Sequence, residues 1–413
     1  MKSVEIFSGA GGLAKGLEIA GFEHEAFVEK NKDACTSLSL NFHKEKVYCG
    51  NIQDYDFSKL NSVDVVAGGP PCQPFSLGGK HQGNMDQRDM FPYAIKTIEL
   101  LKPKLFIFEN VKGLLRDNFK DYFSYILLRL KHPCLLPSTM TDWRSHFQSL
   151  VELEKNAKIE LRYNVSYHLL NAADYGVPQC RERVIITGLR EDLDQVWNFP
   201  KPTHTEERLL YDQYVTGEYW ERHRVAKKDR PQISCSMAEK VESIKGNYVL
   251  FPPEEKPWRT IRDALSGVPH PSEKHEIADH IFRNGARSYP GHTGSCYDYP
   301  AKTIKAGGHG VPGGENMIRY ADGSIRYFTV FEAKRIQTFP DNYKITGSWG
   351  EALRQIGNAV PVLLGEHLGR MAMELLKKEE RYKSKSVASI FNIDSSITGG
   401  FSVPQSQLKV VGA

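Results

Sequence analysis

Short apolar runs alternate with amphipathic stretches through the first 190 residues of the chain. Such runs predict buried β-strands, and they occur at residues 4–7, 63–67, 105–108 and 184–188, with a further strand expected near 25–29. Apolar residues recur at helical spacing between them, as at 13–20 and 92–101. This alternation predicts an α/β fold with a mostly parallel sheet covered by helices on both faces.

The pattern changes after about residue 191, where Pro, Gly, His and aromatic residues become frequent until about residue 323. We expect a second, smaller and irregular domain there. An amphipathic helix is predicted from Pro361, because apolar residues recur at helical spacing and proline suits the first helical position. Residues 119–158 are interpreted as helical packing, and the Ser- and Gly-rich residues 384–413 are left unassigned.

The net charge is small, since 54 Lys and Arg against 50 Asp and Glu give +4 over 413 residues. A charge of this size does not by itself demand a polyanionic partner, so any nucleic-acid signal must be local. Residues 222–230 are one such cluster, with Arg222, His223, Arg224, Lys227, Lys228 and Arg230. The cluster suits phosphate contact, although a basic run is more often a solvated face.

Cysteine usage indicates a reducing compartment, because the seven cysteines are scattered without a C-x-x-C pair. The first apolar strand begins at Val4, which leaves no room for a secretory leader, and no apolar stretch is long enough to span a bilayer. We therefore expect a cytoplasmic protein. His270, His275 and His280 are spaced by five and would not share a helix face, so they are interpreted as loop residues and no metal site is expected.

One of the seven cysteines, Cys72, lies between prolines in Gly69-Pro-Pro-Cys-Gln-Pro-Phe-Ser76, directly after the apolar run 63–67. Prolines restrict their own φ and that of the preceding residue, so Cys72 is expected on a stiff extended turn at the carboxyl end of a strand. Open α/β sheets carry their sites at that edge. A cysteine is usually a small buried hydrophobe, but these neighbours favour an exposed nucleophile.

A glycine turn follows the first strand, since residues 9–14 match the dinucleotide pattern G-x-G-x-x-[GA], and Glu29 lies 18 residues beyond Gly11. The turn of a nicotinamide-dependent dehydrogenase is therefore one interpretation of these residues. A turn that binds S-adenosylmethionine is another, because this cofactor also needs close approach of the backbone and an acidic residue at its ribose, but it has no pyrophosphate. A glycine turn that serves only tight packing of the strand and helix is a third.

The proline-flanked cysteine resembles the nucleophile turn of the DNA (cytosine-5) methyltransferase family. Further segments are similar to the family's motifs and occur in the family's order, at residues 7–12, 109–111, 179–183, 335–340 and 355–361. The resemblance implies a Rossmann-like S-adenosylmethionine-dependent methyltransferase sheet, with a smaller target-recognition domain, in an enzyme of bacterial restriction–modification type.

The resemblance implies a set of cofactor contacts: Phe7, Gly9, Gly11, Glu29 at the ribose, Asn51, Ile52, Pro71, Asn358 and Val360. One position departs from the family pattern, because Asn51 stands where the family usually has aspartate. The amide oxygen of Asn51 can still accept a bond from the adenine amino group, without charge assistance. A solvated loop is the alternative for Asn51.

The chemistry that the resemblance implies begins with Cys72 adding to C6 of cytosine, which makes C5 nucleophilic. Glu109 would protonate or hydrogen-bond N3 at the end of its strand. By resemblance, Arg183 contacts the base O2 and Arg181 supports the site. Without Cys72, Glu109 would be interpreted as a helix cap or surface charge, and the arginines as a solvated strand face.

The expected partner is double-stranded DNA with the target base turned out of the helix. Candidate DNA contacts are Ser76, Lys80 and Arg88 after the nucleophile, and Thr303 and Ile304 in the second domain. The domains implied are 1–193 for catalysis, completed by 350–380, then 194–330 for target recognition and 331–349 as a connecting hinge. We expect a monomeric bacterial enzyme, which a restriction endonuclease could accompany. The alternatives are a relative that methylates tRNA and a catalytically inactive relative that binds DNA.

Overall fold

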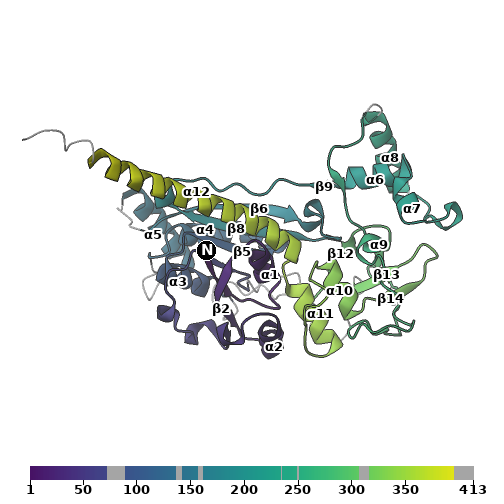
Figure 1. Ribbon diagram of the computed structural model, residues 1–413, viewed down its shortest axis with the longest axis horizontal. Helices are drawn as coiled ribbons and strands as arrows, with labels where there is room; N and C mark the ends of the chain where they lie inside the picture. Colours follow the sequence, from purple (N-terminus) through teal and green to yellow (C-terminus); the bar gives the residue numbers. More distant parts are fainter. Residues whose placement is uncertain are drawn as a thin grey trace, which may run out of the picture.

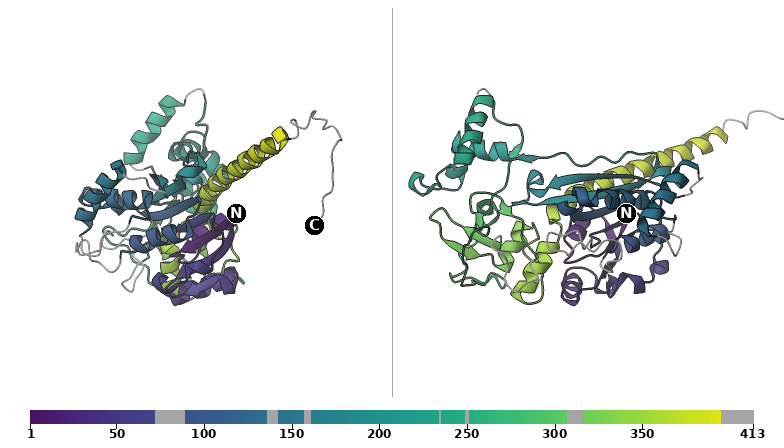
Figure 2. Two further views of the ribbon diagram at one scale, coloured as in Figure 1. Left: turned by 90° about the vertical axis from the view of Figure 1, so that its left-hand side faces the viewer. Right: turned by 180° about the vertical axis from the view of Figure 1, so that it is seen from behind.

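The computed structural model describes residues 1–71, 89–135, 142–156, 161–233, 235–248, 251–306 and 316–394. Cys72, Ser76, Lys80 and Arg88 lie outside the described residues. Figure 1 shows two bodies, a larger one around the main sheet and a smaller one made by the later part of the chain. The right-hand view of Figure 2 shows the same two bodies side by side, and the last helix runs along the larger one and extends beyond it.

The larger body is built on a seven-stranded sheet in the order β3-β2-β1-β4-β5-β8-β6. Its strands are β1 (Lys2–Ile6), β2 (Glu23–Glu29), β3 (Val47–Cys49), β4 (Val65–Gly68), β5 (Leu105–Val111), β6 (Tyr163–Asn171) and β8 (Glu182–Arg190). Only β8 runs antiparallel to its neighbours, β5 and β6. The prediction of a mostly parallel α/β sheet is confirmed, whereas β3 and β6 were not predicted.

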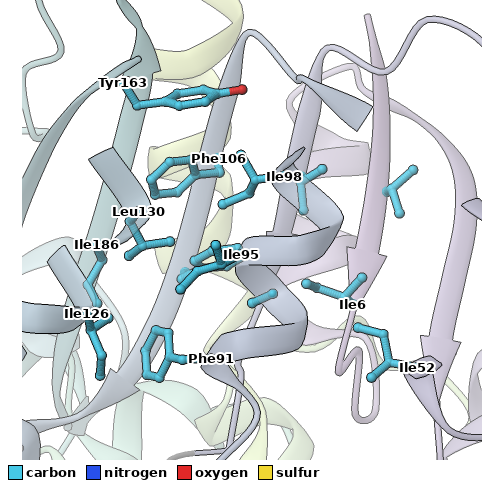
Figure 3. Close-up of a cluster of buried hydrophobic side chains, with 14 of the residues drawn as sticks. Ile6, Ile52, Phe91, Ile95, Ile98, Phe106, Ile126, Leu130, Tyr163 and Ile186 are labelled. Atoms are coloured by element: carbon cyan, nitrogen blue, oxygen red, sulfur yellow. The ribbon is translucent and has the colours of Figure 1, made fainter. Parts of the chain in front are cut away.

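Helices cover both faces of this sheet. Phe106 and Ile186 pack in the cluster that includes α3 (Phe91–Leu101) and α4 (Lys120–Lys131), as Figure 3 shows. Adjacent positions on the same two strands, Ile107 and Ile185, pack in a second cluster with α1 (Gly12–Ile19) and α12 (Val362–Asp394). Successive side chains of a strand point to opposite faces, so burial of both faces explains the unbroken apolar runs.

Contact between α1 and α12 is close enough to require a small residue. A Cβ atom at Gly16 would lie 2.4 Å from the backbone nitrogen of Glu366 and 2.5 Å from the carbonyl carbon of Gly365. Backbone atoms cannot move aside like a flexible side chain, so Gly16 sets the spacing of the two helices. The last helix thereby covers the helix that follows the first strand.

The Gly16→Ala variant is expected to lower the free energy of unfolding by about 1–3 kcal/mol, because it over-packs this contact. Urea unfolding followed by circular dichroism measures the change. Gly246→Ala in α8 (Cys235–Asn247) is a matched control, since a Cβ there meets no atom within 4 Å. A Gly16→Ala protein as stable as the control would contradict the packing argument.

The smaller body is irregular, as expected, and consists of short elements. They are β9 (His204–Thr205), α6 (Glu206–Tyr214), α7 (Glu218–Arg222), α8, β10 (Lys256–Pro257), α9 (Ile261–Ala264), β11 (Ser295–Cys296), β12 (Ala301–Lys302), β13 (Met317–Arg319), β14 (Ile325–Tyr327), α10 (Val330–Ile336) and α11 (Trp349–Asn358). The larger body also contains α2 (Lys32–Asn41), α5 (Trp143–Asn156) and β7 (Gln179–Cys180). Pairing of β12 with β7 joins the two bodies just before the segment 181–183.

His270, His275 and His280 lie outside helices and strands. Within the described ranges, no group of three or more His, Cys, Asp or Glu side chains could hold a metal ion. Over the same ranges, no helix combines the length and the apolar character needed to cross a membrane.

Candidate active site

A cavity of about 1470 Å³ opens where β1, β2, β4 and β5 end, at the carboxyl edge of the sheet. Eleven of the twelve described residues that the sequence assigns to cofactor or catalysis line it: Phe7, Gly9, Glu29, Asn51, Ile52, Pro71, Glu109, Arg181, Arg183, Asn358 and Val360. Gly11 is not among the lining residues. Segments separated by up to about 350 residues therefore meet at one hollow.

The turn after β1 is held by the acid at the end of β2. One carboxylate oxygen of Glu29 accepts a hydrogen bond from the Gly9 amide at 2.7 Å, and the other accepts from the Lys30 and Asn31 amides at 2.8 Å each. The Gly11 amide donates to the Ser8 carbonyl at 3.0 Å. The amides of Gly9 and Gly11 are thus already bonded, which removes them from a pyrophosphate cradle and disfavours the dehydrogenase alternative.

Gly11 differs from its expected role as a cofactor contact. Its φ is 80°, and a Cβ atom would lie 2.7 Å from the Tyr343 hydroxyl and 2.8 Å from Cδ2 of Leu38. The absence of a side chain here allows the turn to pack against Tyr343 instead of exposing Gly11 to the cavity. The G-x-G-x-x-[GA] pattern alone does not distinguish a glycine that lines the cavity from one that packs against the rest of the protein.

Asn51 has a partner that the sequence pattern did not reveal. Its side-chain amide donates to the Asp54 carboxylate at 3.2 Å, so its amide oxygen is left as an acceptor. An aspartate at position 51 would put two carboxylates next to each other, which gives a local reason for the departure from the family pattern.

The turn that leads into Cys72 is fixed on both sides. The Asn110 amide donates to the Pro70 carbonyl at 3.0 Å in a buried contact, and the Met90 backbone amide donates to the Pro71 carbonyl at 3.0 Å. Asn110 was not assigned a role from the sequence, although an amide at the end of the apolar run 105–108 was a signal. These bonds hold Pro70 and Pro71 against β5 and α3 beside the cavity.

Glu109 and Arg183 form a buried ion pair, with Oε1 of Glu109 2.6 Å from Nε of Arg183. Both side chains are close to nine-tenths buried, at 11% and 12% exposure. The Nε–H is not aligned on the carboxylate, so the contact is an ion pair rather than a linear hydrogen bond. Residues 111 and 183 are paired in the β5–β8 ladder, which puts Glu109 and Arg183 on one face as diagonal neighbours.

Arg181 is buried, and one of its terminal nitrogens donates to the carbonyls of Gly357 at 2.8 Å and Ala359 at 3.0 Å. Burial, and then the neighbouring Arg183 charge, lower the pKa of Arg181. Gln337 donates to the same Ala359 carbonyl at 3.1 Å and to the Ile356 carbonyl at 2.6 Å. The Arg181 bonds attach residues 181–183, the arginine segment, to residues 357–360, where α11 ends and the chain continues along the cavity wall; we call residues 357–360 the closing loop.

Thr303 and Ile304 in the second domain were predicted to contact DNA, and the structure differs from this prediction at Ile304. The Thr303 hydroxyl donates to the Cys180 carbonyl at 2.9 Å, whereas the Ile304 side chain is 1% exposed in an apolar cluster. The Ile304 amide donates to the Gln179 side chain at 3.1 Å. The Ile304 side chain therefore packs inside the apolar cluster of the smaller body and offers no surface to DNA, because an apolar side chain gains more by burial.

The basic run at residues 222–230 is partly committed to contacts within the protein. Arg222 lies 3.2 Å from the Asp263 carboxylate and over the ring of Tyr219. Arg230 lies over the ring of Trp220. Lys227 and Lys228 are exposed.

Comparison with known proteins was consistent with this geometry. The family described as C-5 cytosine-specific DNA methylase matches residues 1–132 and 145–374. The Type II methyltransferase M.PspPI of Psychrobacter sp. (strain TA137) is 32% identical over 377 residues, which are 90% of this chain and 79% of that protein. The Type II methyltransferase M.NgoMIV of Neisseria gonorrhoeae is 30% identical over 381 residues, covering 91% of this chain and 98% of that protein.

Two solved structures share the fold. A putative DNA modification methyltransferase encoded within an E. coli prophage aligns with a TM-score of 0.55 at 17% identity, covering 91% of this chain and 99% of that one. The S. pombe Dnmt2 methyltransferase aligns with a TM-score of 0.54 at 16% identity, with the same coverage. The family match spans most of the chain, so this protein belongs to the C-5 cytosine-specific DNA methylase family, whose members transfer the methyl group of S-adenosylmethionine to C5 of cytosine in DNA.

Proposed function

We propose that the cavity at the carboxyl edge of the sheet is the active site of a site-specific methyltransferase that modifies cytosine in duplex DNA, with Cys72 as its nucleophile. One observation carries the proposal: the cavity joins Glu29 to the Glu109–Arg183 pair, and its wall includes Pro71, the residue before Cys72. The reaction needs three parts: an acidic residue that binds the cofactor, a turn that presents the nucleophile, and a carboxyl–guanidinium pair that binds the base.

The residues at the Glu29 end of the cavity fit S-adenosylmethionine. Glu29 is fixed by three backbone amides and retains lone pairs to accept from ribose hydroxyls. Asn51 presents an amide oxygen for the adenine amino group, and Phe7 and Ile52 supply apolar contact. Asn358 and Val360 bound the same space from the far end of the chain. The bound cofactor supplies an electrophilic methyl group on a sulfonium.

At the other end, the neighbouring O2 and N3 atoms of cytosine match the neighbouring groups of Arg183 and Glu109. Glu109 hydrogen-bonds or protonates N3, Arg183 donates to O2, and Arg181 keeps the arginine segment against the closing loop. The Cys72 thiolate forms a bond to C6, and the electrons released into the ring make C5 nucleophilic. After C5 has taken the methyl group, a base removes the proton from C5, the electrons of the C5–H bond re-form the C5–C6 double bond, and the C6–S bond breaks to restore the thiolate.

Residues 194–330, the first part of the smaller body, are proposed to read the DNA. In this division, residues 1–193 with 350–380 form the catalytic unit, 194–330 the target-recognition unit and 331–349 the connection. Packing of α12 on α1 supports the assignment of the last helix to the catalytic unit. Ser76, Lys80, Arg88 and Thr303 are proposed DNA contacts, with Lys80 and Arg88 at phosphates, and the target base is turned out of the duplex to reach the cavity.

The decisive experiment is transfer of a tritiated methyl group from S-adenosylmethionine to duplex DNA, followed by sequencing that maps 5-methylcytosine. We expect modification at C5 within one short recurring sequence. Transfer RNA serves as the competing substrate in a parallel reaction. Methylation of tRNA alone, or the absence of transfer to any duplex, would contradict the proposal.

We further propose that the protein is the modification partner of a restriction endonuclease in a bacterial cytoplasm. Its relatives M.PspPI and M.NgoMIV are bacterial Type II methyltransferases. DNA from cells that express the protein should resist a Type II endonuclease that cuts at the mapped sequence. Equal cleavage of DNA from expressing and non-expressing cells would oppose this role.

A further inference from the structure

We propose that Tyr343 is a positioning residue for the cofactor, because it holds the turn after β1 in its binding conformation. The Tyr343 hydroxyl donates to the Ala10 carbonyl at 2.7 Å across 333 residues of sequence. Both residues are buried, and Tyr343 itself does not line the cavity. The inference rests on the proposed cofactor site and adds a residue that acts on it from outside.

The turn adopts a backbone conformation that needs external support. Phe7, Gly9 and Gly11 have φ values of 51°, 54° and 80°, and such left-handed geometry is unfavourable for a residue with a side chain, as at Phe7. Two side chains from elsewhere bond to the backbone of this turn. Glu29 accepts from Gly9, and Tyr343 donates to Ala10.

Tyr343 is itself held rigidly, so it can impose a position on Ala10. The buried ammonium of Lys334 donates to the carbonyls of Tyr343 at 2.9 Å and Asp341 at 3.1 Å, and it lies 2.7 Å from the Asp279 carboxylate. The Tyr343 ring packs against Phe339 with 4.8 Å between ring centroids. The backbone and the ring of Tyr343 are therefore both held by contacts outside the glycine turn.

The residues after Tyr343 are attached to α2, which begins shortly after Glu29. The backbone amide and carbonyl of Lys344 pair with the Asn41 side chain at 2.8 and 2.7 Å. The Thr346 amide donates to the Ser37 hydroxyl at 2.9 Å, and Ser37 also donates to Gln355 at 2.8 Å. Segment 341–346 thus ties the glycine turn, α2 and α11 into one frame around the cofactor end.

The Tyr343→Phe variant keeps the ring and removes only the hydroxyl, which leaves the Ala10 carbonyl buried without its donor. A buried carbonyl that loses its partner drives the turn to relax, and the relaxed turn must be reordered when the cofactor binds. We expect the Kd for S-adenosylhomocysteine to rise about 5- to 10-fold. At saturating cofactor, kcat should stay within about 2-fold of wild type, because Tyr343 touches neither Glu109 nor Arg183.

Tyr163→Phe is the matched control. The Tyr163 hydroxyl also donates to a backbone carbonyl, that of Pro103, at 2.7 Å, and the residue is equally buried but remote from the cavity. Isothermal titration with S-adenosylhomocysteine, thermal unfolding, and KM and kcat for S-adenosylmethionine are measured for both variants and wild type. Both variants should lose similar stability, while only Tyr343→Phe should bind the cofactor product more weakly.

The inference is overturned if Tyr343→Phe binds S-adenosylhomocysteine as tightly as wild type, or if Tyr163→Phe weakens binding to the same extent. A fall in kcat with unchanged KM would also overturn it, because positioning of the cofactor turn acts on binding. Failure of the wild-type protein to bind S-adenosylhomocysteine at all would instead refute the proposed cofactor site, an outcome that the wild-type titration identifies separately.

Discussion

Replacement of Cys72 by serine is expected to reduce methyl transfer to duplex DNA by about 10⁴-fold or more, which is the order of effect seen when a covalent nucleophile is removed. A serine hydroxyl is far less ionised than a thiol at neutral pH, so it does not add to C6 at a useful rate. Single-turnover transfer of tritiated methyl groups measures the loss. Cys134→Ser, at an exposed cysteine that does not line the cavity, should keep wild-type activity.

The same nucleophile should be trapped by duplex DNA that contains 5-fluorocytosine at the mapped target. Fluorine cannot leave C5 as a proton does, so the C6–S bond persists after methyl transfer. Denaturing electrophoresis and mass spectrometry should find a protein–DNA adduct on a peptide that contains Cys72. A Cys72→Ser protein with full activity, or the absence of an adduct at a proven target, would contradict covalent catalysis.

The Glu109→Gln variant is expected to lower kcat by about 10²–10³-fold, because glutamine can hydrogen-bond N3 but cannot protonate it. The substitution also leaves the Arg183 guanidinium, 12% exposed, without the negative charge of its 2.6 Å partner. Breaking a buried pair in this way is expected to lower the free energy of unfolding as well, by about 3 kcal/mol. Cofactor affinity should change little, since Glu109 lies at the base end of the cavity.

Glu182→Gln is the control for this variant. Glu182 belongs to the same arginine segment and pairs with Lys112 at 2.8 Å, but its side chain is 46% exposed. Exposed pairs contribute little, so kcat and stability should both stay close to wild type. If Glu109→Gln and Glu182→Gln reduced kcat equally, the loss would reflect disturbance of the strand and not an acid at N3.

Much of the sheet could be predicted because its central strands are buried on both faces. Runs such as 105–108 are continuously apolar and therefore visible in the sequence. The two unpredicted strands are at the edges of the sheet. β3 has only three residues, and β6 contains exposed polar positions such as Asn164 and His168, so neither produces an unbroken apolar run.

The candidate site residues could be predicted where they lie within a strand or at its end. Glu29 and Glu109 lie at the ends of β2 and β5, and Arg183 lies in β8, so topology alone brings them to one edge. Contacts between distant segments carry no such signal. The bond from Tyr343 to Ala10 depends on how the two bodies meet, and the burial of Ile304 depends on how the smaller body packs, and local periodicity encodes neither.

Asn110 is an intermediate case. Its position beside Glu109 was visible, but its amide bonds to the Pro70 carbonyl, 40 residues earlier. The same holds for Gln337, which lies in the segment 335–340 that resembles a family motif, while its bonds to the Ile356 and Ala359 carbonyls could be seen only in the fold.

Contact between α1 and α12 has a consequence for synthesis of the protein. Leu13 and Leu17 on the first helix share an apolar cluster with Leu364 and Leu368 on the last one. A ribosome must therefore deliver the chain as far as α12 before this surface can be covered, and until then the nascent chain carries the apolar face of α1 without its partner.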